Sequence, residues 1–218
     1  MSIRINDIAP DFTVESTAGK LNLHQWIGSG YAILFSHPKD FTPVCTTEFG
    51  AVAQLAPEFA KRNTKVLGVS VDNVEEHKKW KRDIESFAGS PADFPIIDDT
   101  SLHVSKLYDM LPADAYLPDG RTPADSATVS TVFIIGPDKK VRLTMSYPMS
   151  VGRNFAEILR ALDAVQATDG VPIATPANWV PGQDVIVALS LNDAQAKEKF
   201  GEIDVKLPYL RFAKAPKK

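Results

Sequence analysis

One stretch of this chain indicates a strand, a loop and a helix in succession: Tyr31-Ala32-Ile33-Leu34-Phe35-Ser36-His37-Pro38-Lys39-Asp40-Phe41-Thr42-Pro43-Val44-Cys45-Thr46-Thr47-Glu48. Residues 31–36 are apolar, which is typical of a buried strand, and residues 46–62 have the apolar spacing of an amphipathic helix. Cys45 is therefore expected in the first turn of a helix that follows a core strand. Unpaired N–H groups and the positive end of the helix dipole stabilise a thiolate there, so the pattern predicts a reactive cysteine.

Cys45 is the only cysteine in the chain. It cannot close an intramolecular disulfide, so a redox role requires an outside partner. The alternative is a structural thiol, because a lone cysteine is often a small buried hydrophobe. The surroundings favour a reactive site: the Thr42 hydroxyl lies within reach of the sulfur on a first helical turn, Pro38 and Pro43 stiffen the loop, and Pro43 suits a helix entry because it lacks an N–H.

Strands and helices alternate along the rest of the chain. Strands are predicted at 65–71, 94–97, 131–135, 141–146 and 185–189, and helices at 74–87, 101–110, 154–168 and 193–200, with a long loop at 111–127. Pro57 predicts a kink or break in the helix at 46–62. Charged residues 75–82 are interpreted as a solvated helix face.

This alternation indicates an α/β domain over residues 1–168, in which the hairpin at 131–146 makes the sheet mixed. Three prolines, Pro172, Pro176 and Pro181, mark a boundary after it. Residues 169–218 are too few to fold alone, so this extension is expected to pack on the main domain or on a second subunit.

Composition excludes several classes of function. The 218 residues carry a net charge of −3 and 44% are hydrophobic, so no basic footprint for nucleic acid is present. The longest apolar run is too short to span a membrane. The start of the chain lacks an apolar signal-peptide region, and one cysteine fits a reducing compartment, so the cytoplasm is expected. Neither the four histidines nor any glycine-rich loop has the spacing of a metal or cofactor site, so no metal or cofactor is expected.

The pattern Pro38-x-x-x-Thr42-x-x-Cys45 is the signature of peroxiredoxins, and its surroundings resemble the one-cysteine, peroxiredoxin-6-like subgroup. The segments that carry this resemblance are Phe35-Ser36-His37-Pro38, Gly152-Arg153-Asn154-Phe155 and Ala174-Thr175-Pro176-Ala177-Asn178-Trp179. The resemblance implies a thioredoxin-like fold with a mixed sheet for residues 1–168. It also implies that residues 169–218 are a C-terminal peroxiredoxin extension, which helps to form a homodimer and the rim of the active site.

The chemistry that the resemblance implies is attack of the Cys45 thiolate on the O–O bond of hydrogen peroxide or a small organic hydroperoxide. The product is a sulfenic acid, which an external thiol of the glutathione or thioredoxin type must reduce. The Thr42 hydroxyl and the Cys45 N–H would donate hydrogen bonds to the peroxide oxygens, and Pro38 would exclude water.

Two further residues have both a functional and a structural interpretation. His37 lies eight residues before Cys45; a lone histidine here is often structural, but the resemblance implies a role in tuning the thiolate or contacting the reductant. Glu48 is expected to orient an arginine through a bidentate pair. Its alternative is a simple first-turn carboxylate that the helix dipole favours.

Ser130 is a departure from the family pattern. Peroxiredoxins place an arginine at this position, just before the strand at 131–135, where it lowers the thiol pKa and binds the peroxide. Arg153 matches a second family arginine and remains available. The loss at position 130 predicts that Cys45 reacts more slowly than in a typical member. It also keeps open an alternative function, a redox sensor or chaperone-like binding protein with weakened peroxidase activity.

Overall fold

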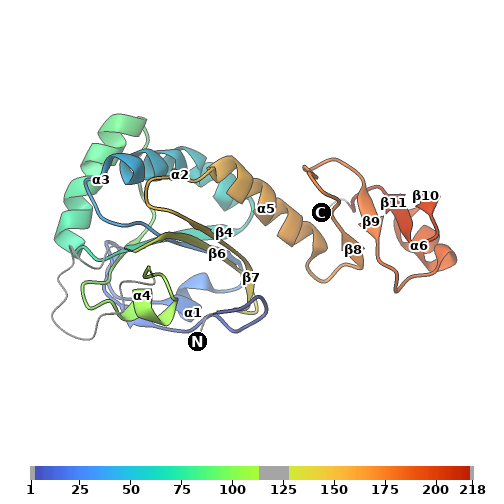
Figure 1. Ribbon diagram of the computed structural model, residues 1–218, viewed down its shortest axis with the longest axis horizontal. Helices are drawn as coiled ribbons and strands as arrows, with labels where there is room; N and C mark the ends of the chain where they lie inside the picture. The colour runs from blue at the N-terminus through green and yellow to red at the C-terminus, as the bar shows by residue number, and fades with distance from the viewer. Residues whose placement is uncertain (1–2, 113–127, 217–218) are drawn as a thin grey trace. The chain divides into compact units, whose positions relative to one another are not determined.

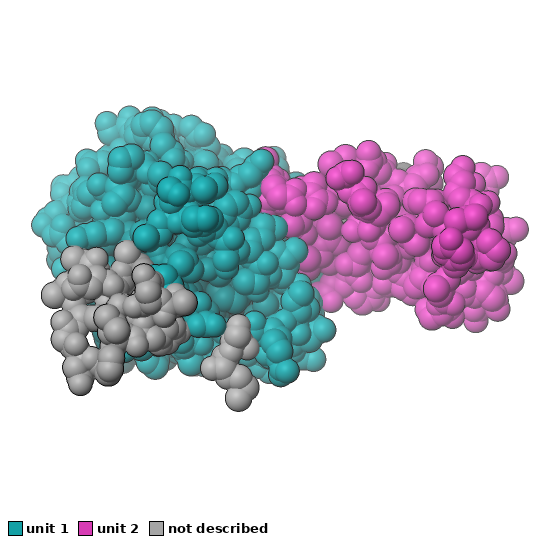
Figure 2. Space-filling view, in the orientation of Figure 1, with its two compact units in different colours: residues 1–155 teal, residues 156–218 magenta. Residues whose placement is uncertain are grey.

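The computed structural model describes residues 3–112 and 128–216 (Figure 1). The chain divides into two compact units, residues 1–155 and 156–218 (Figure 2). This division falls at the start of helix α5 (Phe155–Thr168), whereas the sequence analysis places the boundary after that helix. Most of the predicted loop at 111–127 lies outside the described residues.

The first unit is built on a five-stranded mixed sheet. Its strands, in spatial order, are β5 (Ile96–Asp98), β4 (Thr64–Ser70), β3 (Tyr31–Ser36), β6 (Ser130–Ile135) and β7 (Val141–Tyr147). Strands β3, β4 and β5 are parallel, whereas β6 and β7 are antiparallel to their neighbours. The predicted α/β class and mixed sheet are therefore confirmed.

Helices cover both faces of this sheet (Figure 1). α2 (Pro43–Lys61) and α3 (Val74–Ala88) lie on one face, and α1 (Leu23–Ile27) and α4 (His103–Leu107) lie on the other. β3 is buried on both faces because it sits at the centre of the sheet, which explains its continuous apolar run. A separate pair of short strands, β1 (Thr13–Val14) and β2 (Leu21–Asn22), is antiparallel.

Helix α2 differs from its prediction in two respects. It begins at Pro43 rather than at residue 46, with Thr42 as the extended N-cap residue, because proline is well suited to the first helical position. It also continues past Pro57 without a break. Proline removes a single main-chain hydrogen bond there, and buried side chains on both sides of it, including Ala53 and Phe59, hold the helix against the rest of the unit.

The second unit has its own sheet and core. Its strands are β8 (Ile173–Ala174), β9 (Val185–Val187), β10 (Ile203–Leu207) and β11 (Leu210–Ala213), in the order β10-β11-β9-β8, with helix α6 (Asp193–Phe200). Ile173, Trp179 and Val185 are buried together. Strands β8, β10 and β11 are absent from the prediction. All three are short, and although Ile203, Val205 and Leu207 alternate with polar residues, β10 is largely exposed. Among the described residues no helix has the length and hydropathy needed to cross a membrane.

Candidate active site

Cys45 occupies the first turn of α2, as predicted. Its side chain is buried, while Thr42, the N-cap residue, is half-buried. The Thr42 hydroxyl donates to the Lys39 carbonyl at 2.9 Å, and the Thr42 carbonyl accepts from the Thr46 N–H at 3.0 Å. The Thr42 side chain makes no cap hydrogen bond. The first-turn N–H groups, including that of Cys45, therefore remain available to a ligand.

Opposing effects act on the pKa of the Cys45 thiol. Burial raises the pKa of the Cys45 thiol above its ordinary value, and the nearby Glu48 carboxylate acts in the same direction. The Thr42 hydroxyl, the Lys39 backbone and the Arg153 guanidinium lower this pKa, but they do not outweigh burial. Cys45 occupies the predicted position in the helix, and the exclusion of water from its sulfur opposes the expected stabilisation of the thiolate.

Glu48 and Arg153 form the bidentate pair that the sequence predicts. Arg153 Nε donates to Glu48 Oε1 at 2.9 Å and Arg153 Nη2 donates to Oε2 at 2.6 Å. The Arg153 main-chain N–H also donates to Oε1 at 2.7 Å, and Nη1 donates to the Ser36 carbonyl at 2.7 Å. Both side chains are almost completely buried. Each of the three guanidinium nitrogens therefore donates to a group of the protein.

Aromatic rings pack against this pair. The guanidinium carbon of Arg153 lies 5.2 Å from the ring centre of Phe35 and 5.6 Å from that of Phe155. The two phenylalanine rings meet edge to face at 5.9 Å. Such packing keeps water from the ion pair and strengthens its electrostatic interaction.

Ser130 is the first residue of β6 and is fully buried. Its Oγ has no hydrogen-bond partner among the described residues. The neighbouring residue Thr131 donates its N–H to Ser36 Oγ at 3.0 Å, and its carbonyl lies 3.4 Å from Arg153 Nη1. The residue after Ser130 thus contacts Arg153, and the hydroxyl at position 130 supplies neither the charge nor the reach of an arginine.

His37 directly follows β3 and is completely buried. Burial lowers the pKa of its imidazole, although the partner Asp40 acts in the opposite direction. Its ring stacks on Trp80 at 4.9 Å, and Trp80 Nε1 donates to Thr46 Oγ1 at 3.1 Å. His37 is thereby joined to the first turn of α2, next to Cys45. Pro38, the next residue, is also buried in this loop.

Asp40, which the sequence offered no reason to single out, joins His37 to a second buried histidine, His77. His37 Nε2 lies 2.6 Å from Asp40 Oδ1, and Asp40 Oδ2 lies 2.6 Å from His77 Nδ1. Most charged residues within 75–82 are exposed, as predicted, but His77 is completely buried, so the prediction fails at that residue. The available signal was its spacing: His77, Trp80 and Ile84 recur at helical intervals and form the buried stripe of α3.

Comparison with known proteins agrees with this geometry. Residues 5–144 match the AhpC/TSA family, and residues 164–202 match the C-terminal domain of 1-Cys peroxiredoxin. The mitochondrial peroxiredoxin PRX1 of Saccharomyces cerevisiae is 48% identical over 216 residues, covering 98% of this chain and 81% of that protein. Peroxiredoxin-6 of Mus musculus is 44% identical over 223 residues, covering 97% of each.

Solved structures of related proteins have the same fold as this chain. A structure of the yeast mitochondrial 1-Cys peroxiredoxin superposes with a TM-score of 0.87 at 47% identity, covering 97% of this chain and 99% of that one. The C45S mutant of peroxiredoxin 6 from Arenicola marina superposes with a TM-score of 0.91 at 41% identity over the full length of both chains. The chain therefore belongs to the AhpC/TSA family and has its thioredoxin-like fold. Within that family it is a 1-Cys peroxiredoxin, a thiol-dependent peroxidase that relies on a single cysteine and an external thiol.

Proposed function

We propose that Cys45 reduces hydrogen peroxide and small organic hydroperoxides. The sulfur attacks the terminal peroxide oxygen, the O–O bond breaks, and the leaving oxygen takes up a proton to become water or an alcohol. Cys45 becomes a sulfenic acid. One external thiol then condenses with it, releasing water and forming a mixed disulfide, and a second thiol releases Cys45 as the external disulfide forms. The observation that carries this proposal is the position of the only cysteine, buried in the first turn of α2 beside Thr42.

Each neighbouring side chain has a proposed role. The Thr42 hydroxyl and the Cys45 N–H donate to the peroxide oxygens as charge develops on them. Pro38, which is buried, limits the access of water to the sulfur. Glu48 fixes Arg153, whose guanidinium lowers the pKa of the Cys45 thiol against the effect of burial. His37 acts as a hydrogen-bond acceptor at the edge of the site.

The reductant is an external thiol of the glutathione or thioredoxin type. The chain has no second cysteine to resolve the sulfenic acid. The structure of the yeast relative addresses thiol resolution through glutathione and thioredoxin systems, which supports the same choice here. We assign the protein to the cytoplasm because a single unpaired thiol suits a reducing compartment.

We also propose a homodimer. The C-terminal unit exposes apolar side chains that a lone small unit would be expected to bury: Leu189, Val205, Leu207 and Tyr209. Exposed apolar side chains in such number support an interaction surface, for which a second copy of the chain is the simplest occupant.

The experiment that tests the peroxidase function is the second-order rate constant for oxidation of Cys45 by hydrogen peroxide, with intact mass recorded at each time. We expect a rate orders of magnitude above that of a free thiol and a gain of one oxygen. The Cys45→Ser variant serves as the control and should gain none. A wild-type rate equal to that of free cysteine would contradict the proposal.

A redox sensor is the second candidate. Ser130 in place of the family arginine and the raised pKa of Cys45 both favour a slower reaction with peroxide. A sensor would couple oxidation of Cys45 to a change of assembly. A slow reaction of Cys45 with peroxide, together with a marked change in oligomeric size between the reduced and sulfenic forms on size-exclusion chromatography, would favour the sensor or chaperone-like function.

A further inference from the structure

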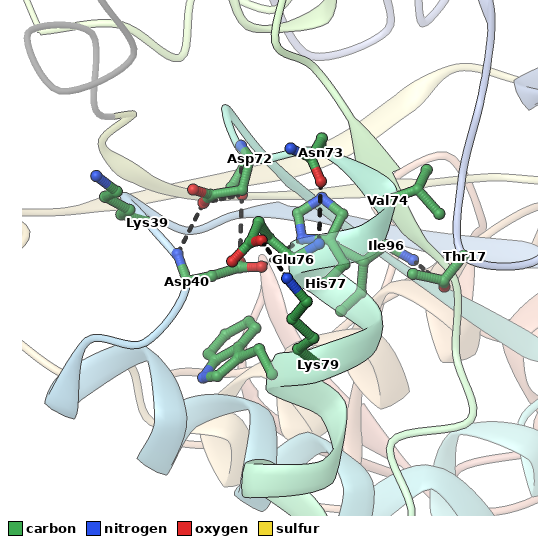
Figure 3. Close-up of polar contacts among 12 residues, drawn as sticks. Thr17, Lys39, Asp40, Asp72, Asn73, Val74, Glu76, His77, Lys79 and Ile96 are labelled. Atoms are coloured by element: carbon green, nitrogen blue, oxygen red, sulfur yellow. Dashed lines mark hydrogen bonds and ion pairs between the residues drawn. The ribbon is translucent and has the colours of Figure 1, made fainter.

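Two histidines and one carboxylate form a continuous buried row in the first unit. His37 follows β3, Asp40 lies in the loop before α2, and His77 belongs to α3. The Asp40 carboxylate lies between them, 2.6 Å from His37 Nε2 and 2.6 Å from His77 Nδ1. All three side chains are completely excluded from solvent. Figure 3 shows Asp40 in its loop with His77 on the neighbouring helix.

His77 has an acceptor on each of its ring nitrogens. Nδ1 faces Asp40 Oδ2, and Nε2 lies 2.9 Å from the main-chain carbonyl of Ile97. A neutral imidazole has only one N–H and cannot satisfy two acceptors. The His77–Asp40 pair must therefore hold one proton more than a neutral histidine and an ionised carboxylate contain.

The carboxylate is the ionised member of the pair. Burial alone would raise the pKa of Asp40, but the hydrogen bonds from His37 and His77 outweigh it and lower this pKa to about 2. The Asp40 N–H donates to the Asp72 carboxylate at 2.8 Å (Figure 3). The Ser70 hydroxyl donates to the same Asp72 oxygen at 2.9 Å. Asp40 Oδ1 lies 2.6 Å from His37 Nε2 and 3.4 Å from the Ser70 hydroxyl, and Oδ2 lies 2.6 Å from His77 Nδ1. The carboxylate therefore faces donors on both oxygens, and this geometry places the extra proton on the His77 ring.

The short distances within this row fit shared protons better than a bound metal ion. Two ligands on one tetrahedral zinc ion, each about 2.0–2.1 Å from the metal, lie about 3.3 Å apart. The two nitrogen-to-oxygen distances here are 2.6 Å, which is the length of a charge-assisted hydrogen bond. The three donors, although clustered within 4.8 Å, are packed too closely to surround an ion.

The same row determines the tautomer of His37. Its Nε2 must carry the proton, because Nε2 faces the Asp40 carboxylate. Its Nδ1 has no hydrogen-bond partner among the described residues. A charged His37 would bury an unpaired N–H, which is unfavourable, so the ring stays neutral and Nδ1 keeps a free lone pair. Stacking on Trp80 and an edge contact of 4.5 Å with Phe49 hold the ring in this orientation.

We propose that His77 is a positioning residue of the peroxidase site: as a buried imidazolium it holds Asp40, and Asp40 holds His37 in the Nε2–H tautomer with Nδ1 as an acceptor. The link to Cys45 is the stack of His37 on Trp80, whose Nε1 donates to Thr46. The functional part of this inference rests on the proposed role of His37. The arrangement of protons does not.

Nitrogen-15 NMR of the histidine rings in the full-length wild-type protein at neutral pH tests the arrangement directly. We expect His77 to show two protonated nitrogens, and His37 to show a protonated Nε2 and a bare Nδ1. A single protonated nitrogen on His77, or a protonated Nδ1 on His37, would overturn the inference. This readout needs no peroxide, so it stands even if the peroxidase assay fails.

The His77→Gln variant tests the functional part. We expect a mixture of His37 tautomers and a fall of about tenfold in the rate constant for Cys45 oxidation, the size of effect seen when an orienting partner is lost. His103→Gln, which changes an exposed histidine on α4, is the matched control and should leave both unchanged.

The Asp40→Asn variant supplies a second test should His77→Gln not fold. Its amide can donate to His37 Nε2, which should move the His37 proton to Nδ1 and lower the rate constant. If either folded variant keeps the wild-type His37 signals and the wild-type rate, His77 does not position His37. If the tautomer changes and the rate does not, the proton arrangement holds and the role of His37 at the site is wrong.

Discussion

Arg153 is bound to Glu48 through two parallel hydrogen bonds of 2.9 and 2.6 Å, across 105 positions of sequence. The pair is electrically neutral, and Arg153 Nη1 donates to the Ser36 carbonyl. Glu48 and Ser36 therefore hold the Arg153 guanidinium in one orientation. The Cys45 thiol lies near one positive and one negative group whose effects on its pKa oppose each other.

The first prediction concerns Ser130. The Ser130→Arg variant should oxidise Cys45 at least about tenfold faster with hydrogen peroxide, because a second guanidinium would both lower the pKa of the thiol and donate to the peroxide. Stopped-flow measurement of the second-order rate constant checks this. Ser130→Ala is the control for loss of the hydroxyl and should match the wild type. Equal rates for the wild type and Ser130→Arg would show that the serine has not slowed the site.

The second prediction concerns stability. Glu48→Ala leaves the Arg153 guanidinium buried without its counter-ion, so the free energy of unfolding should fall by about 3–5 kcal/mol. Urea denaturation measures this. Glu157→Ala removes a carboxylate that pairs with Arg160 at the surface, where the loss should stay below about 1 kcal/mol. A similar loss of unfolding free energy in the two variants would contradict the expectation that a buried ion pair matters more to stability than an exposed one.

The third prediction concerns pH. Since burial raises the pKa of the Cys45 thiol, the thiolate is the minor form at neutral pH and its fraction grows as pH increases. The rate of alkylation of native Cys45 by iodoacetamide should therefore still be rising at pH 9. The Ser130→Arg variant should reach its plateau at lower pH. A wild-type plateau already complete at pH 7 would mean that the first turn of α2 outweighs burial.

The fourth prediction concerns acid stability. The pKa of Asp40 is lowered from 3.8 to about 2, so the ionised carboxylate stabilises the folded state above pH 3.8. This contribution, about 2 kcal/mol, should be lost as pH falls from 3.8 toward 2. The lowered pKa of His37 acts in the same direction at higher pH, because the unfolded chain binds that proton below pH 6.5 more readily than the folded one.

Urea denaturation at pH 7, 5 and 3 measures this dependence. Between pH 5 and 3, the free energy of unfolding of Asp40→Asn should fall less than that of the wild type. Asp83→Asn, on the exposed face of α3, is the control and should follow the wild-type curve. An Asp40→Asn curve parallel to that of the wild type would show that the two histidines do not lower the pKa of the Asp40 carboxylate.

The local sequence pattern was sufficient to predict the strand and the helix that form the site. The apolar run at 31–36 and the helical spacing after it placed Cys45 in the first turn of α2. These signals can be recognised in a single sequence because each acts over a few neighbouring positions. They are the proline at the helix entry, the apolar periodicity and the motif residues Pro38 and Thr42. The strands β8, β10 and β11 of the C-terminal unit were missed because each is only two to five residues long, too short for an alternation to stand out.

By itself, the sequence determined the α/β class, the single thiol, the motif around it and the departure at Ser130. Only the tertiary structure decided that Arg153 is the partner of Glu48, that His77 lies inside the protein, and that Cys45 has a raised pKa. The physical reason is the separation in sequence over which each effect acts. Helix capping and periodicity depend on neighbours in the chain, whereas burial and ion pairing depend on segments that folding brings together from distant positions.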